Sequence, residues 1–334
     1  MVKVGVIGSG FMARQHLLSW SRIGVETHIY GRSGVQEALA VAPAESHDYL
    51  ASLMDVVDVV DICTPTDTHD ELVRAAARRG CHVICEKPLA RTVDEALGML
   101  DACNAAGRHL LVGHVVRYFP EYSAFREKVL EKAVGDLAVI RLGRESFTPN
   151  RPSTNWIFDA ARSGGIIGDL MIHDIDYSLW LAGPVCRVHA RTTRVTSSKF
   201  DDHAYAMLTH SSGALTHLTA SWAQVAPRCR TRIEIAGSTG LITNHADETL
   251  PLSVQFRNEY TGTGGPSAGL PDAGFAGHGD DPFTAELRDF LACIVSGATP
   301  RITAEESIEA LRVSVAAQES SRRRQPVELG KTNE

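Results

Sequence analysis

Three short segments contain residues whose types and spacing suit chemistry. Residues 8–13 have the sequence G-S-G-F-M-A, a glycine turn of the kind that cradles phosphate groups. Lys87 follows a short apolar run and precedes a proline. Asp169 and His173 are four residues apart, so on a helix both side chains project from one face. Lysine, aspartate and histidine can hold or transfer protons. These segments are therefore the candidates for a functional site.

The glycine turn is typical of dinucleotide binding. Gly8 permits a tight turn, Gly10 lets a pyrophosphate approach the backbone, and Ala13 keeps the helix close to the strand. The free amides of the first helical turn, with Phe11 and Met12, would bind the phosphates. The turn directly follows the first strand of an alternating array, which favours this function over a simple connection between strand and helix.

The end of the second expected strand bears on the choice of cofactor. An NAD site usually has an acidic residue about 20 positions after the glycine turn. Here the sequence is Tyr30-Gly31-Arg32-Ser33, without a carboxylate. Arginine and serine can bind a 2′-phosphate, which a carboxylate would repel. We therefore expect NADP(H) to be favoured, with NAD(H) as the alternative, unless Arg32 is only a solvated loop residue.

Lys87 lies in the segment Glu86-Lys87-Pro88-Leu89. The residue before a proline is driven out of helical conformation, and the bond to the proline is compatible with a cis peptide. The segment would lie at the carboxyl end of a parallel sheet, where ligands bind. The alternative is a surface lysine whose stem covers apolar surface.

Asp169 and His173 lie in an apolar stretch that we expect to be helical. Their shared face suggests that both line a pocket. Taken singly, Asp169 could be an acidic residue that stabilises the N-terminus of the helix, and His173 could be a buried histidine with its hydrogen bonds made inside the core. Asp174 falls on another face, where we expect it to be solvated.

The first 115 residues alternate strand and helix signals, which predicts a parallel sheet with helices on both faces. Capping boxes at Thr68 with Glu71 and at Thr92 with Glu95 mark two helix starts. Expected strands lie at 2–7, 25–30, 55–63, 81–85 and 109–115, with the first helix at 11–23.

From about residue 117 the pattern changes to period-two runs joined by short turns, which indicates antiparallel pairing. The glycine- and proline-rich segment 260–282 is expected to be a long loop or lid. Two amphipathic helices close the chain, the second capped by Thr303 and Glu306. Expected helices lie at 120–132 and 164–181, and expected strands at 137–147, 187–196, 203–210, 214–223, 231–236 and 252–256.

The fold class is therefore an α/β Rossmann-type, doubly wound parallel sheet followed by an α+β domain with an open antiparallel sheet. The expected domains are 1–117 for dinucleotide binding and 118–334 for substrate binding and oligomerisation, with the alternative that the C-terminal helices pack back on the first domain. A sheet covered on one face needs cover on the other, which predicts a homodimer or homotetramer. Leu215 or Trp222 would be an apolar contact in it, depending on register.

Composition excludes several classes of protein. With 33 basic against 40 acidic residues, the net charge of −7 argues against a nucleic-acid partner, and no apolar run is long enough to span a membrane. The seven cysteines include no C-x-x-C pair, so reduced thiols in a cytoplasmic protein are expected rather than disulfides or a metal site.

Four motifs in this order resemble the glucose–fructose oxidoreductase/inositol dehydrogenase family over essentially the whole chain. They are G-S-G-F-M-A, T-P-T-D-T-H at 64–69, E-K-P-L at 86–89 and D-L-M-I-H-D-I-D at 169–176. The last of these is most similar to the inositol 2-dehydrogenase branch. Met171 stands where the family often has glycine, which leaves the substrate open. The resemblance also implies cofactor contacts from Thr64, Pro65, His69, Glu86 and Lys87.

The resemblance assigns catalysis to Lys87, Asp169 and His173. Hydride transfer between nicotinamide C4 and a secondary alcohol of a sugar or cyclitol is the implied reaction. His173 would take the hydroxyl proton, Lys87 would stabilise the oxygen, and Asp169 would orient a neighbouring hydroxyl. Position alone suggests further substrate contacts from Arg117, Asn155 and Trp156.

Two rival functions share the fold. The first is a catalytically inactive NADP-binding regulator, which the presence of both Lys87 and His173 disfavours. The second is an imine, enone or biliverdin-type reductase, which would not require Lys87, Asp169 and His173 together.

Overall fold

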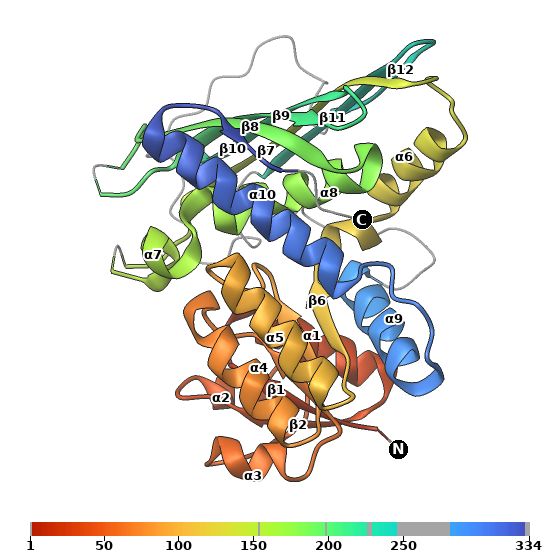
Figure 1. Ribbon diagram of the computed structural model, residues 1–334. Coiled ribbons are helices and arrows are strands. Elements are labelled where there is room, and N and C mark those ends of the chain that lie inside the picture. The colour runs from red at the N-terminus through yellow and green to blue at the C-terminus, as the bar shows by residue number, and fades with distance from the viewer. Residues whose placement is uncertain (1, 153, 198, 226–228, 246–280, 331–334) are drawn as a thin grey trace. The chain divides into compact units, whose positions relative to one another are not determined.

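The computed structural model describes residues 2–152, 154–197, 199–225, 229–245 and 281–330 (Figure 1). The chain divides into two compact units. The first contains Met1–Pro120 and Ala276–Glu309, and the second contains Glu121–Phe275 and Ala310–Glu334. No helix among the described residues combines the length and the apolar character that crossing a bilayer requires.

The first unit is built on a parallel sheet of six strands in the order β3-β2-β1-β4-β5-β6. The chain order reverses between β1 and β4, which is the point where ligands bind in doubly wound sheets. The central strands are short, almost wholly buried apolar runs, as parallel strands covered on both faces must be. Their bounds are β1 Lys3–Ile7, β2 Glu26–Tyr30, β3 Glu45–Ser46, β4 Val59–Ile62, β5 His82–Glu86 and β6 Leu110–Gly113.

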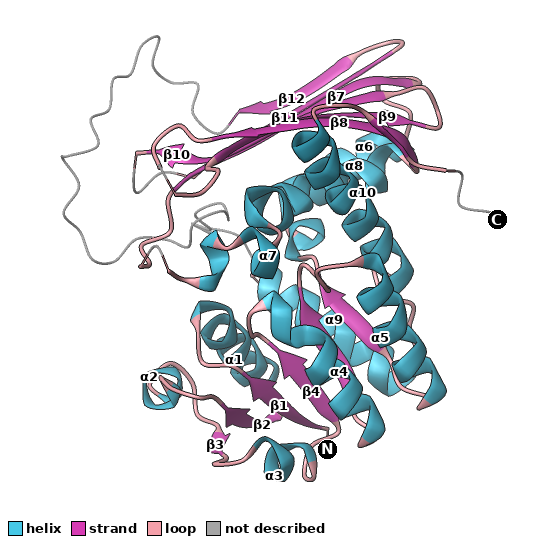
Figure 2. Cartoon of the chain, turned by 60° about the vertical axis from the view of Figure 1, so that its left-hand side comes forward, coloured by secondary structure: helices cyan, strands magenta, loops and turns pink. Residues whose placement is uncertain are grey.

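Helices cover both faces of this sheet. Helix α9 (Pro282–Ser296) packs against α1 (Phe11–Ile23), and Leu17, Trp20 and Phe290 join a buried core with the strands. Helices α4 and α5 pack together on the opposite face (Figure 2). The remaining bounds are α2 Val35–Leu39, α3 Leu50–Met54, η1 Thr66–Thr68, α4 His69–Arg78, α5 Val93–Ala105 and η2 Val115–Tyr118.

Of the three expected capping boxes, only the one at Thr303 forms in full. The Thr92 hydroxyl accepts the Glu95 amide at 3.2 Å, but the Glu95 carboxylate accepts the amide of Arg91 at 3.1 Å and not that of Thr92. Thr303 accepts the Glu306 amide at 3.2 Å while the Glu306 carboxylate accepts the Thr303 amide at 3.0 Å. The prediction of a capping box at Thr68 was wrong. The Thr68 hydroxyl donates to the carbonyl of Pro65 at 2.7 Å and does not cap α4.

The second unit contains a seven-stranded sheet in the order β12-β11-β7-β10-β9-β8-β13. Its neighbouring strands run antiparallel except β7 and β10, which are parallel, so the sheet is mixed. The bounds are β7 Leu137–Phe147, β8 Val185–Thr193, β9 His203–His210, β10 Leu215–Gln224, β11 Arg230–Gly237, β12 Leu241–His245 and β13 Val327–Glu328. The expected strand at 252–256 and most of the expected loop at 260–282 lie outside the described residues.

Helices cover one face of this second sheet, as Figures 1 and 2 show. Trp222 and Leu218 of β10 point to the covered face and are buried, whereas Tyr205 and Met207 of β9 are exposed. Trp222 is therefore not available as an apolar contact between subunits, which was one of the two possibilities expected from the sequence. Ser320 and Ser321 tie the last helix to β8 by accepting backbone amides at 3.0 and 2.9 Å. The helices are α6 Pro120–Leu130, α7 Ala160–Ser163, α8 Ile172–Ala182 and α10 Ala304–Arg323, which crosses the division between the units.

The expected helix at 164–181 is present as a helical run that starts one residue later, at Gly165, and contains a π-turn. Gly164 and Gly165 both have positive φ, which ends α7. A π-helical turn, η4, then spans Ile167–Met171 before α8 begins. Single π-turns inside α-helices are rare and are frequent at functional sites.

Asp174 is buried rather than solvated, which corrects the expectation from the sequence. Its carboxylate accepts a hydrogen bond from the Arg144 guanidinium at 2.8 Å, and both side chains are fully buried. Arg144 also donates to the Tyr122 hydroxyl at 3.0 Å. The pair joins α8 to β7 and so holds the helix that carries His173.

We expect Asp174→Ala to destabilise the second unit by about 3–5 kcal/mol, because the change leaves the Arg144 charge buried without its carboxylate. Chemical unfolding followed by far-UV circular dichroism measures the loss. Asp136→Ala, which removes the exposed partner of Lys132, is the matched control and should cost less than about 1 kcal/mol. Equal losses in the two variants would contradict a structural role for the buried pair.

Candidate active site

The carboxyl edge of the first sheet gathers the residues that the sequence proposed for cofactor binding. Gly8 follows β1, Gly31 follows β2, Thr64 follows β4 and Lys87 follows β5. These four strands are consecutive neighbours in the sheet. Segments separated by as many as 79 residues therefore end at one edge.

The glycine turn has the geometry that a phosphate needs. Gly8 has φ of +122°, and a Cβ there would lie 2.5 Å from the carbonyl oxygen of Cys63. Gly10 precedes α1, and a Cβ at this residue would have no atom within 4 Å, so its backbone is open. The first turn of α1 contains no acidic residue. The turn thus fits the dinucleotide phosphates.

The loop after β2 lies against the glycine turn. The Ser9 hydroxyl donates to the carbonyl of Ser33, and a Cβ on Gly31 would be 3.0 Å from that hydroxyl. Arg32 is exposed. Arg14, which the sequence analysis missed, donates to the Ser9 carbonyl at 3.2 Å.

The charges around this loop are mixed. A Cβ on Gly34 would lie 3.9 Å from the guanidinium of Arg14 and 3.7 Å from the carboxylate of Glu37. Two arginines and one glutamate therefore surround the place where the ribose of a dinucleotide is bound in Rossmann folds. The spacing of Arg14, one turn into the helix after the glycine turn, was the signal that could have found it.

His69 holds two of these segments together. It is buried, with Nδ1 3.1 Å from the carbonyl oxygens of Pro88 and Leu89 and Nε2 3.0 Å from that of Thr64. Burial lowers the pKa of His69. The ring thus joins the Thr64 loop to the segment after Lys87, and this is a positioning role rather than an exposed contact. The peptide bond between Lys87 and Pro88 is cis.

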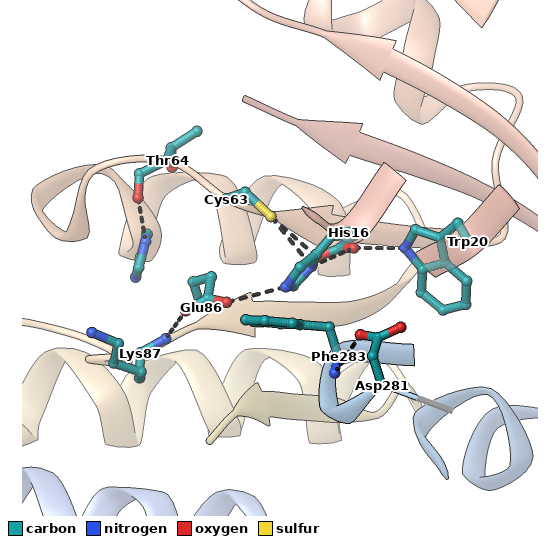
Figure 3. A network of polar contacts seen from close by, with 10 residues as sticks. His16, Trp20, Cys63, Thr64, Glu86, Lys87, Asp281 and Phe283 are labelled. Carbon is teal, nitrogen blue, oxygen red and sulfur yellow. Dashed lines mark hydrogen bonds and ion pairs between the residues drawn. The ribbon is translucent and has the colours of Figure 1, made fainter. Parts of the chain in front are cut away.

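A buried polar network adjoins the backbone of Lys87 (Figure 3). The backbone amide of Lys87 donates to Glu86 Oε2 at 3.1 Å, and Glu86 Oε1 is 3.1 Å from His16 Nε2. His16 Nδ1 is 2.9 Å from Asp61 Oδ2, which also accepts from the Trp20 indole at 2.7 Å. Burial alone would lower the pKa of His16, but the Asp61 carboxylate raises it well above its usual value.

The network makes His16 an imidazolium between two carboxylates. It therefore fixes the Glu86 side chain, which in turn fixes the backbone at Lys87. No signal local to His16 or Asp61 predicted their contact, because 45 residues separate them.

Glu286 of α9 lies near the same network. Both of its carboxylate oxygens are buried, and neither has a hydrogen-bond partner among the described residues. Burial raises the pKa of Glu286 well above its usual value, and the neighbouring Glu86 adds to the rise. Glu286 is thus held as a neutral acid inside the first unit.

This arrangement predicts how stability depends on pH. The folded state holds the Glu286 proton more tightly than the unfolded chain, so its stabilising effect is complete below about pH 4.5 and is lost as the pH rises. We expect Glu286→Gln and the wild type to have the same free energy of unfolding near pH 4. Above pH 4.5 the free energy of unfolding of Glu286→Gln should exceed that of the wild type by up to about 1.4 kcal/mol more for each pH unit.

Thermal unfolding of both proteins between pH 4 and pH 8 measures this difference. Glu305→Gln is the control, because Glu305 is exposed in the first turn of α10. If the difference in unfolding temperature between the wild type and Glu286→Gln stayed constant from pH 4 to pH 8, Glu286 would not retain its proton.

The second unit carries the other candidate residues. Asp169 is half-buried in η4, and His173 is buried in the first turn of α8. Because a π-turn is slightly wider than an α-turn, four residues still make close to one full turn, and the two side chains share a face. Asn155 accepts the Ile157 amide at 3.2 Å and so caps the short helix η3, Trp156–Phe158.

Arg117 is placed differently from the expectation. It is 1% exposed and lies inside the first unit, where it donates to the carbonyl of Arg301 and contacts the Glu306 carboxylate, both at 3.2 Å. Arg301 donates back to the carbonyl of Arg117 at 2.8 Å. The arginine therefore joins η2 to the start of α10 and is not an open position for a polyol.

Comparison with known proteins shows the family. Residues 2–114 match the oxidoreductase family with an NAD-binding Rossmann fold, and residues 122–243 match the GFO/IDH/MocA C-terminal domain. The chain belongs to the GFO/IDH/MocA family. It is an enzyme, an NAD-binding oxidoreductase that acts on CH–OH groups.

Several relatives align along their whole length. The D-apiose dehydrogenase of Paraburkholderia graminis is 30% identical, over 98% of this chain and 89% of its own. The myo-inositol 2-dehydrogenase of Thermotoga maritima is 28% identical, over 98% of both chains. A solved levoglucosan dehydrogenase in complex with NADH and levoglucosan has a TM-score of 0.82 and 25% identity, and covers 99% of this chain and 100% of its own. The similarity to an inositol dehydrogenase agrees with the resemblance drawn from the motifs.

Proposed function

We propose that the protein transfers a hydride between the nicotinamide of NADP(H) and a secondary alcohol or ketone of a sugar, sugar derivative or cyclitol. One observation carries this proposal. Lys87 lies at the ligand-binding edge of a Rossmann sheet. Its backbone amide donates to the Glu86 carboxylate, which in turn contacts His16. A surface lysine whose only role is solubility needs no such support. Relatives of this chain are dehydrogenases of D-apiose, myo-inositol and levoglucosan, which supports a polyhydroxylated substrate.

Each residue has a defined part in the proposed reaction. A bound nicotinamide dinucleotide supplies the acceptor of the hydride that leaves the carbinol carbon. His173 accepts the hydroxyl proton, so the alcohol loses two electrons and two hydrogens and becomes a ketone. The Lys87 ammonium donates a hydrogen bond to the same oxygen and stabilises its developing negative charge. Asp169 accepts from a neighbouring hydroxyl and orients the ring.

Lys87 belongs to the first unit, and His173 belongs to the second. His173 lies in α8, whose first turn is fixed by the buried Asp174–Arg144 pair. Asp169 lies in the π-turn just before it. Asn155 and Trp156 are proposed as further substrate contacts, and Thr64 and Pro65 as cofactor contacts.

NADP(H) is the proposed cofactor because cations outnumber anions at the loop after β2. Arg32 is exposed there, Arg14 approaches Gly34, and Glu37 opposes them. A 2′-phosphate carries close to two negative charges, which a guanidinium can bind with two hydrogen bonds. NAD(H) remains the alternative, since the solved levoglucosan dehydrogenase binds NADH.

A substrate screen tests the proposed function. Purified protein is incubated with cyclitols, aldoses or keto-sugars together with NADP, NAD or their reduced forms, and absorbance at the nicotinamide band is followed. We expect turnover with at least one polyol class and a higher kcat/KM with NADP(H). Turnover confined to imines or enones would support the rival reductase, and cofactor binding without turnover on any class would support the rival regulator.

We further propose self-association through the exposed face of the second sheet. Met207 lies on this face between His189 of β8 and His217 of β10, next to the exposed Tyr205. Met207→Asp is expected to shift the sedimenting species from a dimer or tetramer to a monomer. The control is Val195→Asp, because Val195 is also an exposed apolar residue but lies outside the sheet. A wild-type protein that sediments as a monomer at micromolar concentration would contradict the proposal.

A further inference from the structure

Two histidines meet on the edge of the first sheet, away from the glycine turn. His28 lies in the middle of β2 and His47 directly follows β3, the edge strand. His28 Nδ1 is 3.0 Å from His47 Nε2. Glu45 of β3 pairs with His28 in the strand register and places its Oε2 3.8 Å from the same Nδ1. Two imidazoles and a carboxylate therefore converge.

The outer nitrogen of His28 must carry a proton. His28 Nε2 is 3.2 Å from Glu26 Oε1, which also accepts from the Lys3 ammonium at 2.7 Å. This ion pair with the Lys3 ammonium identifies Glu26 as a carboxylate. An ionised carboxylate can only accept hydrogen bonds, so Nε2 is the donor. In a neutral ring, Nδ1 then presents a lone pair.

The outer nitrogen of His47 is also a donor. His47 Nδ1 is 3.3 Å from the hydroxyl oxygen of Ser52. That hydroxyl has one hydrogen, which it donates to the carbonyl of Tyr49 at 2.8 Å. Ser52 must therefore accept from His47 Nδ1, and Nε2 of the neutral ring also presents a lone pair.

The two inner nitrogens thus face each other with lone pairs at 3.0 Å, beside a carboxylate. This arrangement is repulsive unless a cation lies between them. We propose that His28, His47 and Glu45 form a binding site for a borderline divalent transition-metal ion, with Zn²⁺ as the representative. A tetrahedral Zn²⁺ with bonds of about 2.0–2.1 Å separates its ligand atoms by about 3.3 Å. The two ring nitrogens, now 3.0 Å apart, would have to separate slightly, and Glu45 Oε2, now 3.8 Å from His28 Nδ1, would have to move closer.

The outer contacts are those of a metal site. Metal-bound histidines generally donate their second ring N–H to a carboxylate or other oxygen, which fixes the tautomer and the ring orientation. Glu26 has this role for His28, and Ser52 has it for His47. The Glu45 side chain is 70% exposed and His47 is half-buried, so an ion can enter from solvent.

Among the described residues, a second cluster of ligand-type residues consists of His16, Asp61 and Cys63, and its charges are different. His16 there is an imidazolium already paired with Asp61, and burial raises the pKa of the Cys63 thiol well above its ordinary value. A metal needs the thiolate and the neutral imidazole. The charges of that cluster therefore stabilise its protons and do not favour a bound metal ion.

Zinc binding to the full-length, chelator-treated protein tests the proposal. Competition of Zn²⁺ with a chromophoric chelator gives stoichiometry and affinity. We expect one Zn²⁺ per chain, with affinity reduced at least tenfold in His47→Gln and in Glu45→Gln. Glu26→Gln should weaken binding by about 10–100-fold without removing a ligand, because it acts only through His28.

His109→Gln is the matched control, because His109 is an exposed histidine that stacks on His82 in the same unit. It should bind Zn²⁺ like the wild type. Thermal unfolding checks each variant, since Zn²⁺ should raise the midpoint of the wild type and of His109→Gln but not of His47→Gln. The proposal is overturned if His47→Gln binds Zn²⁺ as well as the wild type does, or if the wild type binds none. In the second case a shared proton is the cation between the rings.

Discussion

Replacing Lys87 or His173 by alanine is expected to lower kcat by about 10²–10⁴-fold, the usual contribution of a positioned proton-transfer group. The affinity for the cofactor should stay within a few-fold of the wild type, because the phosphates bind at the glycine turn. Steady-state kinetics on the substrate found by the screen give kcat, and fluorescence titration with the reduced cofactor gives its Kd.

Controls separate catalysis from general damage. Lys132→Ala removes an exposed lysine that pairs with Asp136, and His217→Ala removes an exposed histidine of β10. Lys132→Ala should keep the kcat of the wild type. His217→Ala should keep it as well, although His217 lies on the proposed association face, because the reaction does not use that face. Asp169→Asn should raise KM as well as lower kcat, because the amide cannot carry the charge that orients the substrate. A Lys87→Ala or His173→Ala enzyme that kept most of its kcat would refute the role assigned to that residue.

Arg32→Ala is expected to weaken NADPH binding by about 10–100-fold, while NADH binding changes by no more than a few-fold. A charge-assisted hydrogen bond to phosphate is commonly worth about 1.5–3 kcal/mol. Glu37→Gln should act in the opposite direction, because it removes the carboxylate that approaches Gly34 from the same side. Titration of the wild type and both variants with NADPH and NADH measures these changes.

Equal losses of NADPH and NADH in Arg32→Ala would show that the guanidinium only stacks on the adenine, which would remove the physical basis for NADP. Gly31→Asp would add the carboxylate that NAD sites usually have, but it tests the choice of cofactor less directly. A Cβ at this position would lie 3.0 Å from the Ser9 hydroxyl and 3.1 Å from Val35, so Ser9 must move before an aspartate can act on the ribose.

Elements with strong local signals were predictable from the sequence. The bounds of β7 and β9 agree with the expected strands at 137–147 and 203–210, because alternating apolar residues end there at turn residues. The glycine turn and the helix at 11–23 were equally clear. Their order along the chain then indicated the parallel sheet and the edge at which Gly8, Gly31, Thr64 and Lys87 emerge.

Contacts between distant residues were not predictable in this way. Asp174 looked solvated because its partner, Arg144, lies 30 residues earlier on another element. The parallel pairing of β7 with β10 was missed because short turns indicate only which consecutive strands pair. For the same reason, the sequence did not predict the contacts of Glu86 with the Lys87 amide and with His16, or the hydrogen bonds between Arg117 and Arg301.

Transfer of deuterium from a labelled polyol tests the central claim most directly. The wild-type enzyme is incubated with oxidised cofactor and a cyclitol or sugar that carries deuterium on its carbinol carbons, and the reduced cofactor is analysed by mass spectrometry. Direct hydride transfer predicts a reduced cofactor heavier by one mass unit, formed by the wild type but almost absent with His173→Ala. Reduced cofactor without deuterium, or none with any polyol class, would contradict the proposed reaction.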